Sequence, residues 1–98
     1  MLTQRIGSLL RLTITDDPVF RGFAFSQMVL DAIAPDDREV VLDLHLITTL
    51  HSPGLANLVQ IYVSCTKRGV ILRLAAVNDF NRRLLATTHL DQLFTLQA

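Results

Sequence analysis

The sequence lacks most of the residues that build a chemical site. Its 98 residues include one cysteine, Cys65, so the chain can form no internal disulfide and cannot build a zinc site from thiolates. Cys65 lies on a helical apolar stripe and is expected to be a small hydrophobe in the core. The three histidines match no local metal-binding motif, and the four glycines form no glycine-rich phosphate loop. We therefore expect neither a metal ion nor a cofactor.

Net charge is also missing. The chain has 9 lysines and arginines and 9 aspartates and glutamates, which gives a formal net charge of +0 at pH 7. A nucleic-acid-binding domain of this size normally carries a basic excess on one face, so we expect no nucleic-acid partner. A neutral chain has little charge repulsion between copies, so the composition is compatible with a homodimer or a regular protein partner.

Long hydrophobic runs are absent as well. No stretch is long enough to cross a bilayer, and the N-terminal segment lacks the charged, apolar and small-residue parts of a signal peptide. We expect a protein that is not embedded in a membrane and that resides in the cytoplasm.

What the sequence does contain is enough apolar material for one folded unit. Hydrophobic residues make up 50% of the chain, and no linker or repeat divides it, so we expect residues 1–98 to be a single domain. Alternating apolar and polar residues predict strands at residues 3–6, 10–14, 39–44, 70–76 and 94–96. Helical spacing predicts helices between them, over residues 17–34, 52–68 and 78–88.

This alternation of strands and helices is typical of an α/β fold with parallel neighbouring strands. The second face of the strands is polar, since it carries Arg11, Thr13, Asp43, His45 and Arg73. Parallel strands that are covered by helices on both faces read as solid apolar runs instead. The sequence therefore predicts a mixed, largely parallel sheet with helices packed mainly on one face and a wetter second face.

The turn His51-Ser52-Pro53-Gly54 stands between a predicted strand and a predicted helix. Serine as the N-cap and proline as the first helical residue make a sound helix start, and we expect Ser52 and Pro53 to have these roles. The same turn lies beyond the carboxyl end of a parallel strand, where α/β proteins gather their binding surfaces. The structural and the functional interpretation can both hold.

An enzymatic interpretation is weaker. Asp43, His51 and Ser52 can be drawn as a nucleophilic triad, but neighbouring residues of one turn rarely point at each other, and no oxyanion hole is identifiable. Asp43 is either a functional carboxylate or a cap for the loop that follows it. The pair Arg82-Arg83 is either a solvated face or a contact for an acidic partner. We expect no catalytic residue.

Five segments form an ordered set over residues 38–96: Val40–Leu44, Ser52–Leu55, Arg68–Leu74, and Arg83–Leu85 with Leu90–Phe94. In their order and spacing they resemble the STAS domain of anti-sigma factor antagonists. The family pattern is a strand ending in Asp-Leu, an Asp-Ser-Ser-Gly-Leu turn that opens a helix, a glycine before the next strand, and a closing leucine-rich helix.

The resemblance implies a four- or five-stranded sheet with helices on one face, and a non-enzymatic role. Members of the family bind a partner, typically an anti-sigma factor of the serine kinase type, and so release the sigma factor for transcription. Their switch is a phosphoacceptor serine directly before the glycine of the turn, because a phosphate adds charge and bulk to the docking surface.

The chain departs from this pattern at the turn itself. Pro53 stands at the phosphoacceptor position and has no hydroxyl, and His51 replaces the turn aspartate. Ser52 is the remaining candidate phosphoacceptor. We therefore predict a regulatory protein-binding module that is not phosphorylated at the usual position. The expected partner-binding residues are Thr49, His51, Ser52, Pro53, Gly54 and Leu55.

The alternative is a STAS-like structural accessory subunit of an ABC-type lipid transporter or of a stress-signalling assembly. Phosphorylation is dispensable in such a role, so the loss of the acceptor favours this alternative more than the composition does.

Overall fold

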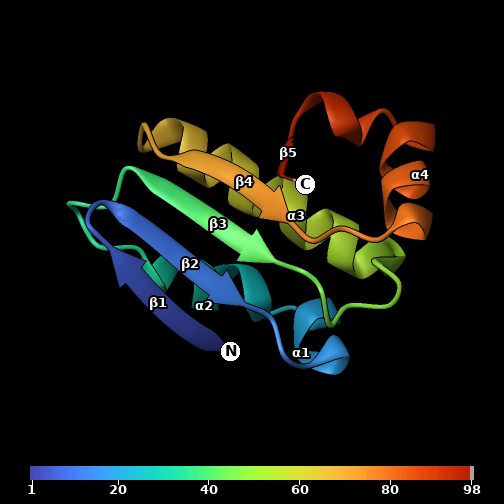
Figure 1. The fold of residues 1–98 in the computed structure, drawn as a ribbon, viewed down its shortest axis with the longest axis horizontal. Helices are drawn as coiled ribbons and strands as arrows, with labels where there is room; N and C mark the ends of the chain where they lie inside the picture. Colours follow the sequence, from blue (N-terminus) through green and yellow to red (C-terminus); the bar gives the residue numbers. More distant parts are fainter. Residues whose placement is uncertain (98) are drawn as a thin grey trace.

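A five-stranded sheet forms the frame of the molecule (Figure 1). The computed structural model describes the backbone of residues 1–97 and the side chains of residues 1–94. The strands lie side by side in chain order: β1 (Leu2–Ile6), β2 (Leu9–Thr13), β3 (Glu39–Asp43), β4 (Ile71–Ala75) and β5 (Thr95–Gln97). β1 runs antiparallel to β2, and the other neighbours are parallel. The predicted mixed, largely parallel sheet is confirmed.

The helices differ from the prediction chiefly in the first helical segment. They are α1 (Asp17–Arg21), α2 (Phe25–Ala32), α3 (His51–Lys67), α4 (Asp79–Thr87) and the short 3₁₀ helix η1 (Leu90–Gln92). The single helix predicted over residues 17–34 is two helices, because Gly22 is extended (φ −73°, ψ 151°) and ends α1. The break leaves the carbonyls of Phe20 and Gly22 free to accept hydrogen bonds from the side-chain amide of Asn57 in α3.

The core lies between the sheet and the helices behind it in Figure 1, chiefly α2 and α3. Alternate residues of β2, β3 and β4 point into it, as the sequence predicts: Leu10, Leu12, Val40, Leu42, Leu72 and Leu74. α3 contributes Leu58, Ile61 and Cys65 from the opposite side. Burial of these side chains is the main favourable term in the stability of the fold.

The second face of the sheet carries charged residues that pair with one another. Strand register places Arg11, Val41 and Arg73 in one row, so the aliphatic stems of two arginines flank Val41, which is only 1% exposed. Arg11 Nη2 lies 2.7 Å from Asp43 Oδ2, and Arg73 Nε lies 3.1 Å from Glu39 Oε1. This face is wetter than the core face but its charges are locally balanced.

The helix ends follow the local chemistry of the sequence. Asp16 caps α1 by accepting a hydrogen bond from the Val19 N–H, and Asn78 caps α4 in the same way through the Asn81 N–H. After α3, Gly69 has a φ of +71°, the left-handed conformation that ends many helices.

Candidate functional site

The turn before α3 lies at the carboxyl end of the parallel strands, with α1 and α4 on either side of it (Figure 1). His51, Ser52 and Pro53 are exposed there, while Thr49 and Leu55 are half-buried and Gly54 is buried. The turn therefore presents three consecutive residues to solvent and inserts the fourth into the protein.

The predicted N-cap at Ser52 is wrong. α3 begins one residue earlier, at His51, and Leu50 stands at the N-cap position with no capping side chain. The chain enters the helix through a left-handed residue, since His51 has a φ of +56°. Pro53 is thus the third helical residue and not the first, a position where its missing N–H still removes no hydrogen bond of the helix.

Gly54 is fixed by the packing of α1 against α3. A Cβ atom at this position would overlap the ring of Phe20, which is fully buried and makes an edge-to-face contact with Phe25. Only a glycine lets the start of α3 approach the Phe20 ring this closely. Gly54 is thus the one predicted partner-binding residue that faces the core, and its packing fixes the position of the exposed ones.

Two buried asparagines hold the chain on either side of the turn. Asn81 of α4 accepts a hydrogen bond from the Leu50 N–H at 3.0 Å and donates to the carbonyls of Ile47 and Thr48. Asn57 of α3 donates to the carbonyls of Phe20 and Gly22 at 2.9 Å. Sequence reasoning missed both residues, although a polar amide between apolar helix positions is a signal for such a role.

Asp43 is engaged with its own neighbours at the end of β3. Its carboxylate accepts a hydrogen bond from Arg11, and it also accepts one from the His45 N–H at 3.0 Å. The His45 ring Nδ1 lies 2.8 Å from Asp43 Oδ1. Burial raises the pKa of this carboxyl, but the hydrogen bonds from His45 and Arg11 together outweigh burial, so the pKa is lowered. Asp43 thus caps the loop that follows β3. Its histidine partner is His45, whereas the triad considered from the sequence contained His51.

The loop before the turn and the start of α4 carry exposed apolar and basic side chains. Leu46, in the loop after β3, is 49% exposed, and Phe80, in the first turn of α4, is 55% exposed. Arg83 is exposed on the same helix, whereas Arg82 donates from Nε to the Val77 carbonyl. Leu46 and Phe80 were not among the predicted site residues, because nothing in the spacing of the residues shows that the loop and α4 meet.

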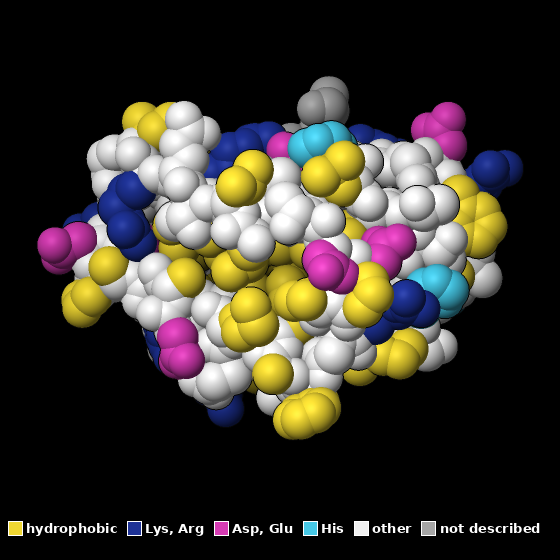
Figure 2. Space-filling model, turned by 90° about the horizontal axis from the view of Figure 1, so that it is seen from below, with side chains coloured by type: hydrophobic (Ala, Val, Ile, Leu, Met, Phe, Trp, Pro, Cys, Tyr) yellow, Lys and Arg dark blue, Asp and Glu magenta, His cyan; other side chains and the backbone are white. Residues whose placement is uncertain are grey.

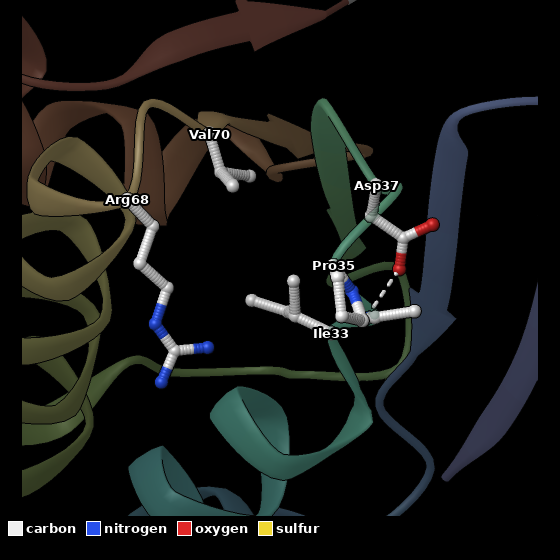
Figure 3. Close-up of a pocket in the computed structure, with 6 residues that line it drawn as sticks. Ile33, Pro35, Asp37, Arg68 and Val70 are labelled. Atoms are coloured by element: carbon white, nitrogen blue, oxygen red, sulfur yellow. Dashed lines mark hydrogen bonds between the residues drawn. The ribbon is translucent and has the colours of Figure 1, made fainter.

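A cavity of about 290 Å³ opens at the opposite end of the sheet, between the ends of α2 and α3 (Figure 3). Arg68 and Asp37 stand on opposite sides of it, with Ile33 between them. Both charged groups have internal partners: Arg68 reaches the Leu30 carbonyl at 3.4 Å, and Asp37 accepts from the Ala34 N–H at 2.8 Å and pairs with Arg5. Within residues 1–97, no group of three or more His, Cys, Asp or Glu side chains could hold a metal ion.

The fold and the turn define the class: a small α/β module with a presented turn at the carboxyl end of its parallel strands. The STAS domain family model matches residues 21–98, so the chain belongs to the STAS domain family. None of the helices in the described part of the chain is long and apolar enough to span a membrane. No curated protein matches the sequence.

Two solved proteins share the fold closely. One is a candidate anti-sigma factor antagonist from Thermotoga maritima, whose NMR structure has a TM-score of 0.83 at 20% identity, covering 97% of this chain and 78% of the other. Its crystal structure has a TM-score of 0.72 at 19% identity, covering 97% and 83%. The other is a sulfate transporter family protein from Wolinella succinogenes, with a TM-score of 0.72 at 26% identity, covering 91% and 76%.

Proposed function

We propose that this chain is a regulatory module that docks a partner protein through the turn from Thr49 to Leu55. The observation that carries the proposal is the way the turn is held: three exposed residues, His51 to Pro53, sit on a rigid base. Gly54 against Phe20 forms that base, together with the amides of Asn57 and Asn81. A surface that is fixed before binding loses little conformational freedom when the partner docks.

The composition of the surrounding surface supports a protein partner. Leu46 adds exposed apolar area on the loop that leads to the turn, and Phe80 adds it on α4, whose Asn81 holds that loop; exposed aromatic groups are enriched where proteins bind each other. A STAS fold shared with a candidate anti-sigma factor antagonist makes an anti-sigma factor of the serine kinase type the first partner to test.

The docking surface is proposed to work without phosphorylation at the usual position. Pro53 stands there and offers no hydroxyl. Ser52 is exposed and is the one hydroxyl among the three presented residues. We expect no phosphate on Ser52, because Pro53 immediately after it changes the backbone that a kinase of this family would meet.

Titration calorimetry with a purified anti-sigma factor of the source organism tests the docking surface. Ser52→Arg adds bulk and charge to the exposed turn without touching the core, and it should weaken binding at least tenfold. Thr66→Arg, on the exposed last turn of the same helix, is the matched control and should bind like the wild type. Absence of binding by the wild-type chain, or equal binding by Ser52→Arg, would contradict the proposal.

Incubation with the partner kinase and ATP, followed by mass spectrometry, tests the expectation that the turn is not phosphorylated. The wild-type chain should remain unmodified, and Pro53→Ser should gain one phosphate. A phosphate on Ser52 of the wild type would overturn this part of the proposal.

A structural accessory subunit is the second candidate, and the replacement of the acceptor by Pro53 favours it, since such a subunit needs no switch. This candidate predicts that the chain co-purifies with a membrane transporter complex and does not bind an anti-sigma factor. Binding of the anti-sigma factor through Ser52 would exclude it.

A further inference from the structure

The outer edge of β1 is an open backbone edge. Within residues 1–97, β1 ends the sheet and pairs only with β2, and all five of its residues are exposed. The N–H and C=O groups that point away from β2 are therefore available to another strand. Exposed edges of this kind are templates for pairing with a second chain.

Lysine, proline and a bulge, three of the devices that protect sheet edges, are missing from this strand, whose pairing with β2 is continuous from Leu2 to Ile6. A charged side chain that points inward is a further such device, and Arg5 is a residue of that kind. Arg5 is the one charged side chain of β1 and turns toward the helix layer, where it lies 2.8 Å from the Asp37 carboxylate and donates to the Ala32 carbonyl at 3.1 Å. Its charge is thus already balanced within the chain.

We propose that a second copy of this chain pairs antiparallel with β1 about a twofold axis beside Gln4. The sequence of the strand is complementary to itself in that register. Leu2, which is 65% exposed, would lie opposite Ile6 of the second copy, which is 62% exposed. The two Gln4 side chains would face each other and exchange amide hydrogen bonds. Aliphatic and amide pairs directly across two strands are favourable.

The surface next to the edge extends the apolar contact. Figure 2 looks at this side of the molecule and shows hydrophobic side chains gathered over its middle, with most charged ones toward the margins. Arg5 of β1 reaches the Ala32 carbonyl at the end of α2, and Met28, one turn earlier on that helix, is 41% exposed. A stable dimer buries roughly 1,200–2,000 Å², more than one pair of short strands provides, so side chains of the helix layer such as Met28 supply a necessary part of the interface.

A second copy fits this edge better than a charged partner does. The chain has a formal net charge of +0, so two copies do not repel each other. Pairing at β1 also leaves the turn before α3 free at another side of the molecule (Figure 1). The proposed dimer is therefore independent of the docking function, and either can fail without the other.

Sedimentation equilibrium over a wide range of protein concentration tests the dimer. The wild-type chain should reach twice its monomer mass. Gln4→Lys places two like charges opposite each other and should weaken the dimer by roughly tenfold or more, as should Gln4→Glu. A mixture of the two variants should restore association, because the opposite charges then meet. Ile71→Lys, an exposed aliphatic position on β4, is the matched control and should dimerise like the wild type.

Each outcome decides the proposal. A wild-type chain that stays monomeric at every concentration overturns it. A mixture of the two Gln4 variants that associates no better than either alone also overturns it, since residue 4 would not then face its copy. Equal weakening by Ile71→Lys would move the interface to the open face of the sheet and contradict pairing at the β1 edge. Circular dichroism of all variants verifies that the monomer fold is kept.

Discussion

Pro53 and Gly54 are neighbours in the turn but have different reasons to be there. Pro53 is exposed, and its effect is chemical, since it removes a hydroxyl from the presented surface. Gly54 is buried, and its effect is steric, since the Phe20 ring occupies the space of a Cβ atom. The family pattern alone predicts that a glycine stands here, but only the structure gives the reason.

Gly54→Ala should lower the free energy of unfolding by about 1–3 kcal/mol, because the added methyl group forces the Phe20 ring out of a filled core. Urea denaturation measures the change. Phe20→Leu makes room beside position 54, so the double variant should lose less stability than the sum of the two single variants. Additive losses would show that the two residues do not compete for the same space.

At the scale of elements, the loop between β3 and α3 is held by a residue far along the chain. Asn81 lies in α4 and is fully buried, yet its amide satisfies the Leu50 N–H and two loop carbonyls. Sequence patterns predict where the strand ends and the helix begins but not which distant helix crosses the loop. For the same reason, the expected Ser52 N-cap was wrong: the loop takes its hydrogen bonds from α4.

Asn81→Ala should destabilise the fold by about 2–3 kcal/mol, because the Leu50 N–H and the Ile47 carbonyl lose their buried partner. Hydrogen exchange locates the effect: the Leu50 amide should exchange much faster, while amides of β2 keep their relative protection. Asp16→Ala serves as the comparison, since it removes the cap of a different helix, α1. Exchange at Leu50 that accelerates no more than exchange across the sheet would contradict a local role.

A second long-range tie joins β1 to the segment before β3. The Arg5 guanidinium hydrogen-bonds to Asp37 and lowers the pKa of that carboxyl; burial opposes the shift, and the Ala34 N–H adds to it. Because the folded pKa lies below the unfolded one, near 3.9, the resulting stability is fully present above the unfolded pKa. It is lost as the pH falls through the folded pKa.

Asp37→Asn should therefore lower the melting temperature at neutral pH and flatten its fall in acid. The difference between wild type and variant should shrink as the pH drops from about 5 toward 3, below the ordinary carboxyl pKa. Asp36→Asn, at the exposed neighbouring position, should leave the profile of the wild type. A constant difference at every pH would mean that the charge of Asp37 contributes nothing.

At the scale of the whole molecule, the sequence predicted the architecture well. The period-two strands and the polar second face are local signals, and the structure confirms them. The split of the first helical segment at Gly22 was not predicted. It leaves the Phe20 and Gly22 carbonyls without helical partners, and their partner Asn57 lies far along the chain in α3, where local patterns do not show it.

Cys65 reports on the stability of the whole fold. Its side chain is fully buried, and burial raises the pKa of its thiol, so the native protein should react slowly with iodoacetamide. Labelling should accelerate in urea in step with global unfolding measured by circular dichroism, because no small opening of the surface reaches this residue. Fast labelling without denaturant would show a local opening of α3 away from the sheet.

The missing hydroxyl at Pro53 affects how partner binding at the turn can be regulated. A docking turn that phosphate can modify is set by the ratio of kinase to phosphatase, independently of how much protein is present. In the proposed function, a turn without that hydroxyl is always competent, so the fraction of partner that is occupied follows the abundance of this chain relative to its dissociation constant. Regulation would then lie in synthesis and degradation of the protein, on the timescale of cell growth.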